Sequence, residues 1–185
     1  MNKSAGIVLL LAFGVFVAGC ASSEEGAPSG EGEAKKVSRA TAYINPRSDS
    51  ELFGSAIFIR EGDQITVQVS IEAAPPGEHA VHIHETGDCS APDATSAGGH
   101  WNPTGADHGK WNEAPFHLGD IGNVLAGEDG TGSIMLTTDL WEMGTGETND
   151  IMGKAVIVHA GPDDFTTQPT GAAGGRLGCG VINAG

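Results

Sequence analysis

The stretch QITVQVSI at residues 64–71 alternates polar and apolar side chains with a period of two. Successive side chains of a β-strand point to opposite faces, so this alternation is typical of a strand with one face in a core and the other toward water. Six further β-branched runs, separated by turn residues such as Asn45-Pro46, lie at residues 40–44, 54–60, 79–84, 132–137, 154–159 and 178–182. The sequence has no long helical pattern, so it predicts an all-β fold, an antiparallel barrel or sandwich.

The composition agrees with short strands and many turns, because the 185 residues include 29 Gly and only 5% aromatics. The formal net charge is −15, and the part after residue 36 holds 20 Asp and Glu against six Lys and Arg. A chain without a basic patch cannot neutralise phosphates, so we expect no nucleic-acid partner. The acidic surface either aids solubility or reflects adaptation to high salt.

The N-terminal segment is typical of an export signal. Residues 1–19 combine Lys3 with an apolar stretch that is too short for a confident membrane span. The stretch ends in Val17-Ala18-Gly19-Cys20, which resembles a bacterial lipobox, in which the Cys receives a lipid and becomes the first residue of the mature protein. The alternative is an ordinary signal peptide with an incidental Cys.

Residues 20–36 are predicted to be a lipidated Cys and a flexible linker, because Ser, Gly, Glu and Pro dominate them. Residues 37–185 are then the folded domain. We expect an exported protein held at the cell envelope, at the outer membrane or in the periplasm where there is an outer membrane, and otherwise on the outer face of the cell membrane. If Cys20 carries lipid, Cys89 and Cys179 remain as one possible disulfide.

The seven His are the main chemical clue. His82 and His84 are two apart on a predicted strand, so both imidazoles face one side. Between residues 86 and 130 the strand signal fades, which is typical of a long functional loop. Further candidate ligands lie in this loop or end a predicted strand: His100, His108, His117, Asp120 and His159. Imidazole suits zinc and copper, and nitrogen ligands with one carboxylate suit tetrahedral zinc, so the pattern predicts a metal site.

Four separate runs resemble motifs of the copper/zinc superoxide dismutase family. They are HAVHIHETGDC at 79–89, SAGGHWNP at 96–103, HLGDIGN at 117–123 and GRLGCGVI at 175–182. The resemblance covers about residues 37–185 and keeps the order of the family. It implies a Greek-key antiparallel β-barrel or immunoglobulin-like sandwich with long metal-binding and electrostatic loops. It also implies dismutation of superoxide to O₂ and H₂O₂ by a copper redox centre bridged to a structural zinc.

Carried over by position, the resemblance implies a role for each matching residue. The implied copper ligands are His82, His84, His100 and His159. The implied zinc ligands are His100, His108, His117 and Asp120, so His100 is shared by both metals.

Several residues around the metals also match the family. Asp163 would link a copper-bound and a zinc-bound His. The alternative is that Asp163 is an ordinary acidic residue of a loop. Cys89 and Cys179 match the family disulfide. Arg176 matches the Arg beside the copper opening and, with His100, is the implied catalytic pair, because a guanidinium attracts and binds an anion.

The chain also departs from the family pattern. Residues 166–174 contain no Lys, where the family often has Lys that steers the anion, and Ala172 and Ala80 stand where Asn and Gly are common. Steering would therefore rest mainly on Arg176 and the metals, and we expect an encounter rate below the best in the family.

Two alternatives stay open beside an enzyme. One is a non-catalytic exported copper/zinc-binding protein, and the other is a structural surface lipoprotein with zinc alone. The expected partners are superoxide as a small anionic substrate, a membrane through lipid on Cys20, and a second copy in a possible homodimer.

Overall fold

Residues 64–71 form the strand that their alternation predicts. The structure is a computed structural model that describes residues 37–185. In it Ile65, Val67, Val69 and Ile71 are buried, while the polar residues between them are half-buried or exposed. The apolar side chains of the neighbouring strands pack against this row in one core, which is the expected result of period-two patterning.

Nine strands and one short 3-10 helix make up the described part of the chain. The strands are β1 (Arg39–Pro46), β2 (Phe53–Glu61), β3 (Gln64–Glu72), β4 (Gly77–His84), β5 (Asp120–Ala126), β6 (Gly132–Thr138), β7 (Ala155–His159), β8 (Arg176–Val181) and β9 (Asn183–Ala184). The helix η1 covers Thr95–Ala97.

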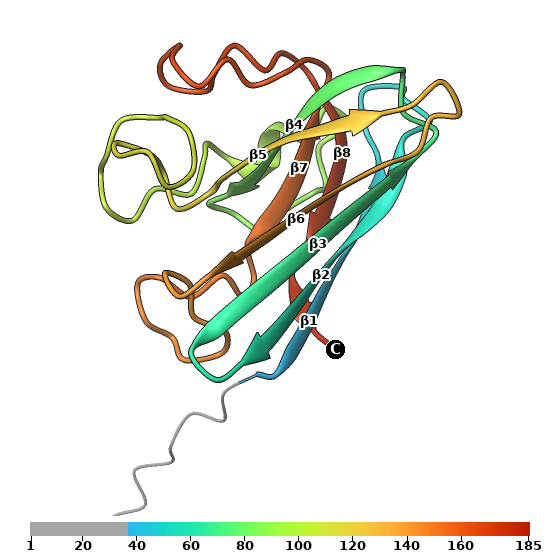
Figure 1. Ribbon diagram of the computed structural model, residues 1–185. Coiled ribbons are helices and arrows are strands. Elements are labelled where there is room, and N and C mark those ends of the chain that lie inside the picture. The colour runs from blue at the N-terminus through green and yellow to red at the C-terminus, as the bar shows by residue number, and fades with distance from the viewer. Residues whose placement is uncertain (1–36) are drawn as a thin grey trace, which may run out of the picture. The chain divides into compact units, whose positions relative to one another are not determined.

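All the paired strands are antiparallel, in the order β5-β4-β7-β8-β1-β2-β3-β6, and β9 pairs with β1. The two ends of this order, β5 and β6, are consecutive in the chain, so the sheet curls into a nearly closed barrel (Figure 1). Barrel closure removes exposed sheet edges. The predicted all-β Greek-key fold is confirmed.

The long loop predicted over residues 86–130 is wrong in its second half, because β5 occupies Asp120–Ala126. Gly122 and Asn123 interrupt the apolar pattern of this strand, which hides it in the sequence. Asn123 is turned to the loop after β7 rather than to the core, as its bonds to Asp163 show. The correction moves Asp120 from a loop to the first position of a strand.

Two long connections follow β4 and β7. One joins β4 to β5 and carries η1, and the other joins β7 to β8 (Figure 1). The predicted disulfide joins Cys89, in the first connection, to Cys179 on β8. This pairing is confirmed, and it ties the beginning of the β4–β5 connection to the barrel wall.

The predicted signal, the lipidated Cys20 and the linker lie outside the described residues. Within residues 37–185, no helix has the length and apolar character needed to cross a membrane.

Candidate metal centre

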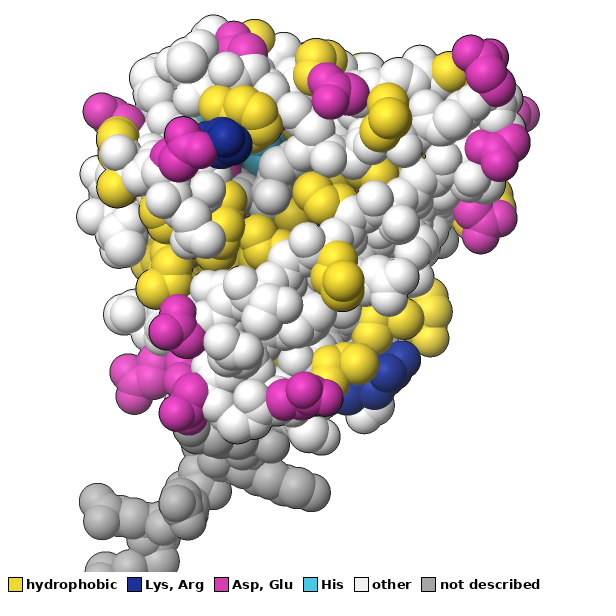
Figure 2. Space-filling view, in the orientation of Figure 1, with side chains coloured by type: hydrophobic (Ala, Val, Ile, Leu, Met, Phe, Trp, Pro, Cys, Tyr) yellow, Lys and Arg dark blue, Asp and Glu magenta, His cyan; other side chains and the backbone are white. Residues whose placement is uncertain are grey.

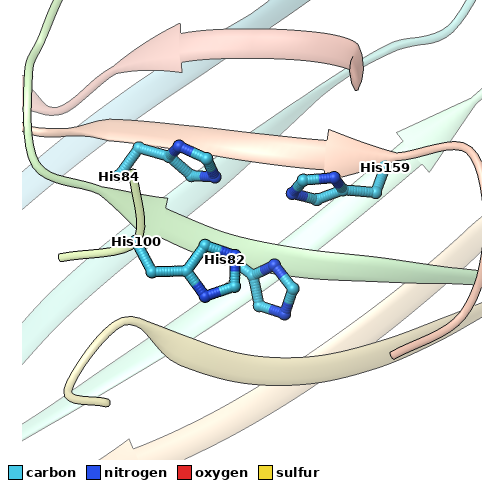
Figure 3. Close-up of side chains that lie close together, drawn as sticks. All are labelled: His82, His84, His100 and His159. Atoms are coloured by element: carbon cyan, nitrogen blue, oxygen red, sulfur yellow. The ribbon is translucent and has the colours of Figure 1, made fainter. Parts of the chain in front are cut away.

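Four buried imidazoles converge beside β4. His82 and His84 are two residues apart on this strand, so they face the same side. Strand β7 pairs directly with β4, which brings His159 alongside them. His100 comes from the β4–β5 connection and is held there by a β-bridge to His84. The ring centres of His82 and His100 lie 4.0 Å apart, and those of His82 and His159 lie 4.9 Å apart (Figure 3). The structure therefore brings together all four predicted copper ligands, which we call the four-histidine group.

In each ring of the four-histidine group, one nitrogen makes a hydrogen bond that fixes the ring orientation, and the other nitrogen points toward the centre of the group. The Nε2 of His82 donates to Asp163 Oδ2 at 2.9 Å, and the Nδ1 of His84 donates to the Gly98 carbonyl at 2.9 Å. The opposite nitrogens are buried and have no hydrogen-bond partner within residues 37–185: His82 Nδ1, His84 Nε2, His100 Nε2 and His159 Nε2. One ligand atom from each ring lies within 4.8 Å of the others.

Unpaired buried nitrogens are costly, so four of them aimed at one place fit a bound cation. Burial lowers the pKa of His84 to about 2 and holds the pKa of His159 well below its ordinary value. Both rings are therefore neutral at ordinary pH, which is the state that a metal ligand needs. Nitrogen ligands of this kind suit copper.

A second group joins three imidazoles to one carboxylate. Asp120 lies 3.0 Å from His100 Nδ1, 3.0 Å from His108 Nδ1 and 3.2 Å from His117 Nδ1. The Nδ1 atoms of His100 and His117 are 3.4 Å apart. Ligands on a tetrahedral zinc with bonds of about 2.0–2.1 Å are separated by roughly 3.3 Å. The spacing of this group, called the Asp120 group below, therefore fits zinc.

Charge and protonation also favour a cation in the Asp120 group. Burial opposes ionisation of Asp120, but its contacts with three imidazoles outweigh burial and hold its pKa far below the ordinary range. Burial lowers the pKa of His100 to about 4 despite the nearby Asp120. His108 Nδ1 is buried near Asp120 and has no hydrogen-bond partner among residues 37–185. Burial opposes charge on this ring, but Asp120 and Asp163 raise its pKa to about 9, so a bound cation would take the place of the proton that they favour on Nδ1.

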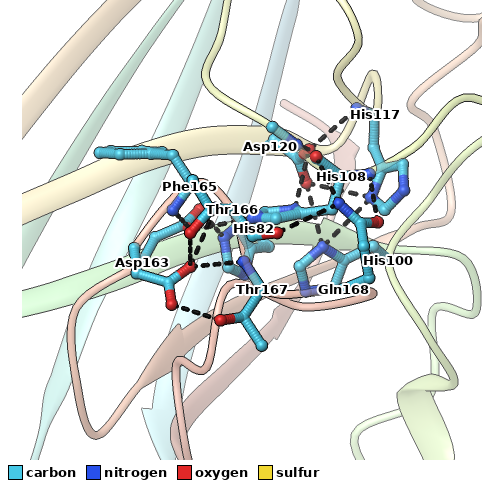
Figure 4. A network of polar contacts seen from close by, with 12 residues as sticks. His82, His100, His108, His117, Asp120, Asp163, Phe165, Thr166, Thr167 and Gln168 are labelled. Atoms are coloured by element: carbon cyan, nitrogen blue, oxygen red, sulfur yellow. Dashed lines mark hydrogen bonds and ion pairs between the residues drawn. The ribbon is translucent and has the colours of Figure 1, made fainter.

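Asp163 connects the two groups. Its Oδ2 accepts from His82 at 2.9 Å, and its Oδ1 accepts from His108 at 2.8 Å (Figure 4). Burial raises the pKa of Asp163, but the bonds from His108 and His82 outweigh burial and lower it, so the carboxylate is ionised. The structure thus places the predicted carboxylate between one ring of each group, where it fixes both ring orientations.

Arg176 lies beside the four-histidine group. Its guanidinium donates to the carbonyls of Ala94 at 2.6 Å and of Gly98 at 2.8 Å. The same Gly98 carbonyl accepts the hydrogen bond from His84, so one peptide group positions both side chains. Arg176 is half-buried and carries a positive charge, which lies within electrostatic range of His84.

Two further side chains support the centre. Asn123 donates to the carbonyl of Asp163 at 3.0 Å and accepts from its backbone N–H at 2.7 Å. Sequence reasoning missed this role because the partner is 40 residues away along the chain. His79 lies outside both groups, and its ring nitrogens contact the carbonyls of His159 and Pro75.

Comparison with known proteins decides the family. The family described as "Copper/zinc superoxide dismutase (SODC)" matches residues 52–182. The chain belongs to the copper/zinc superoxide dismutase family. Over 139 residues it is 35% identical to "Superoxide dismutase [Cu-Zn] 2" of Aquifex aeolicus (strain VF5), a match that covers 73% of this chain and 81% of that protein.

A solved structure shares the fold of this chain. The crystal structure of the clock protein EA4 is 36% identical, has a TM-score of 0.70, and is matched over 80% of this chain and 96% of the EA4 chain. Membership in the family confirms the predicted enzyme class and its two metals, copper and zinc. The homodimer stays a prediction.

Proposed function

We propose that this protein is an exported, lipid-anchored superoxide dismutase in which His100 bridges copper and zinc. The observation that carries the proposal is the place of His100, whose Nδ1 belongs to the Asp120 group while its Nε2 points into the four-histidine group. A single imidazole can serve two metals only in this arrangement, because its two nitrogens point in opposite directions.

The four-histidine group would hold copper, and the Asp120 group would hold zinc. Copper supplies two oxidation states, and the balanced reaction is 2 O₂⁻ + 2 H⁺ → O₂ + H₂O₂. Zinc has no redox chemistry, so the Asp120 group would order the β4–β5 connection and fix the orientation of His100.

The protein itself supplies charge, orientation and a proton. Arg176 attracts the anion and donates hydrogen bonds to it, since both its hydrogen-bond partners in the fold are neutral carbonyls and the acid that interacts with its charge, Asp93, is a longer-range neighbour. His100 can hold a proton at Nε2, because this nitrogen has no hydrogen-bond partner in the part of the protein that the structure describes. Asp163 and Asp120 keep the surrounding rings in place during turnover.

The surface charge bears on how the substrate arrives. On the face seen in Figure 2, Asp and Glu side chains lie around the periphery and Lys and Arg are sparse. An anion therefore meets net repulsion at long range, while Arg176 supplies attraction close to the four-histidine group. This supports an encounter rate below the best in the family.

Metal analysis coupled to a superoxide-decay assay tests the catalytic proposal. We expect one copper and one zinc per chain together with turnover, and loss of copper-dependent turnover in His159→Ala and His82→Ala. Copper without turnover would support a binding protein instead, and zinc alone would support a structural lipoprotein. Full activity in either variant, with its metal content verified, would refute the ligand assignment.

The proposed location rests on the sequence of residues 1–36. We expect the mature protein to begin at Cys20 with a covalent lipid and to partition into detergent with the membrane fraction. Cys20→Ala should abolish lipid attachment. A mature protein that is cleaved elsewhere and carries no lipid would leave an ordinary exported enzyme.

A further inference from the structure

We infer that Gln168 is a positioning residue for the zinc ligand His108, an inference that rests on the proposed function. Gln168 lies in the β7–β8 connection, outside all the matched motifs. Its Oε1 accepts from the backbone N–H of His108 at 2.9 Å, and its Nε2 donates to the carbonyl of His108 at 2.9 Å (Figure 4). One side-chain amide thus binds the main chain of His108 on both sides, as a neighbouring strand would. We call this pair of bonds the Gln168 clamp.

His108 needs such support because it belongs to no strand. The ring is well fixed, with Nε2 bonded to Asp163 and Nδ1 facing Asp120. The backbone at His108 lies in an irregular part of the β4–β5 connection, and the polar groups of its main chain find partners in Gln168. Ring and backbone together fix the direction of the Nδ1 lone pair, and zinc affinity depends on that direction.

Gln168 is itself held in place by its own loop. The ionised carboxylate of Asp164 accepts from the backbone N–H groups of Thr166 and Thr167, at 2.9 and 2.8 Å. The carbonyl of Thr167 accepts from the N–H of Gly171 at 2.7 Å. These bonds shape the turn that presents the Gln168 amide to His108, so the clamp is preorganised rather than a chance surface contact.

The centre contains a second clamp of the same design. Asn123 binds both main-chain polar groups of Asp163, just as Gln168 binds those of His108. Asp163 and His108 are bonded to each other. The two partners of this bond are therefore fixed by separate side-chain amides, one from β5 and one from the β7–β8 connection.

Exposure of Gln168 makes the inference testable without unfolding the protein. The side chain lies at the surface, so its replacement leaves no cavity in the core. Gln168→Met keeps the length of the side chain and removes both hydrogen bonds, and Gln168→Ala removes its bulk as well. Thr170→Ala is the matched control, because Thr170 is exposed in the same loop and its hydroxyl makes no hydrogen bond within the described residues.

The experiment measures zinc affinity of the full-length protein by competition with a chromophoric chelator, and the visible spectrum of Co²⁺ placed in the zinc site. We expect Gln168→Met and Gln168→Ala to lower zinc affinity by about 10–100-fold, as loss of a partner that orients a ligand typically does. Both should alter the Co²⁺ spectrum, while Thr170→Ala should match the wild type. Thermal unfolding of the metal-free variants should be unchanged.

Wild-type zinc affinity and an unaltered Co²⁺ spectrum in Gln168→Met would overturn the inference, since the bulk of the side chain would then suffice. Equal destabilisation of all the metal-free Gln168 variants would overturn it in favour of a general structural role. Failure of the proposed function is a different result, namely a wild-type protein that binds zinc but does not bind copper or consume superoxide.

Discussion

At the scale of single residues, the proposed function assigns the attraction of the substrate to Arg176. We expect Arg176→Ala to lower kcat/KM for superoxide on the order of tenfold with unchanged metal content, because it removes the positive charge beside the four-histidine group. Arg176→Lys should recover part of the loss, since it restores the charge but not the planar fork. Pulse radiolysis or stopped-flow decay of superoxide measures the rates.

Arg39→Ala is the control for charge alone, because Arg39 is exposed on β1 and its guanidinium makes no hydrogen bond among residues 37–185. It should leave kcat/KM nearly unchanged. Equal losses in the two variants would show that only net charge matters and would contradict a local role for Arg176.

Gly171 permits the contact between Asp163 and His108. A Cβ at this position would overlap Asp163 Oδ1 and lie 2.7 Å from His108 Nε2, and the backbone φ of +64° disfavours any other residue. We therefore expect Gly171→Ala to weaken zinc binding by about 10–100-fold, measured by chelator competition. Gly175→Ala is the control, since its Cβ would meet no atom within 4 Å. Unchanged zinc affinity in Gly171→Ala would contradict the assigned role of Asp163.

The buried imidazoles should give the metal-free protein a stability maximum near pH 6.5. Burial lowers the pKa of His84 to about 2 and of His100 to about 4, and lowers that of His159 as well. These rings bind protons more readily when unfolded, so stability falls as the pH drops from 6.5 toward 4. Burial opposes charge on His108, but Asp120 and Asp163 raise its pKa to about 9, so its contribution is lost as the pH rises through 9.

Chemical denaturation of the metal-free protein at a series of pH values measures this profile. Above about pH 5, Asp120 and Asp163 are ionised in both states, and nearer pH 4 the unfolded chain begins to protonate them, which lowers stability in the same direction as the buried imidazoles do. Stability that increases as the pH falls from 6.5 to 4 would be inconsistent with neutral buried imidazoles.

At the scale of elements, the disulfide links the β4–β5 connection to β8. It spans 90 residues, for which the chain-entropy model gives about 4–5 kcal/mol. We expect the double variant Cys89→Ser, Cys179→Ser to lose up to about this free energy of unfolding. Turnover should fall too, because the tethered segment supplies the Ala94 and Gly98 carbonyls that hold Arg176. Denaturant unfolding with and without a reductant measures the first effect, and a loss below about 1 kcal/mol would contradict it.

At the scale of the whole molecule, the net charge of −15 sets how the substrate approaches. Added salt shortens the screening length from about 30 Å at 0.01 M to about 10 Å at 0.1 M. It therefore screens the long-range repulsion of the anion more than the short-range attraction of Arg176. We expect kcat/KM to lie below the diffusion limit and to rise with ionic strength. A diffusion-limited rate that falls steeply with salt would contradict this expectation.

The sequence by itself determined the fold class, and its resemblance to one family implied the candidate ligand set. Period-two alternation at residues 64–71 predicts a half-buried strand, because successive side chains of a strand face opposite sides and only one side is buried. The four motifs resemble those of one family and occur in the same order as in that family. His82 and His84 could be placed on one face because the strand period is a property of the backbone.

Only the tertiary structure decided how these residues meet. It revealed β5, whose Gly122 and Asn123 conceal the pattern, and it showed that the two rings joined by Asp163 are those of His82 and His108. It also showed the clamps of Asn123 and Gln168, which join residues 40 and 60 positions apart. Hydrogen bonds of this kind form only where the folded chain brings distant segments together. A local pattern of residues does not show which distant segments will be neighbours in space.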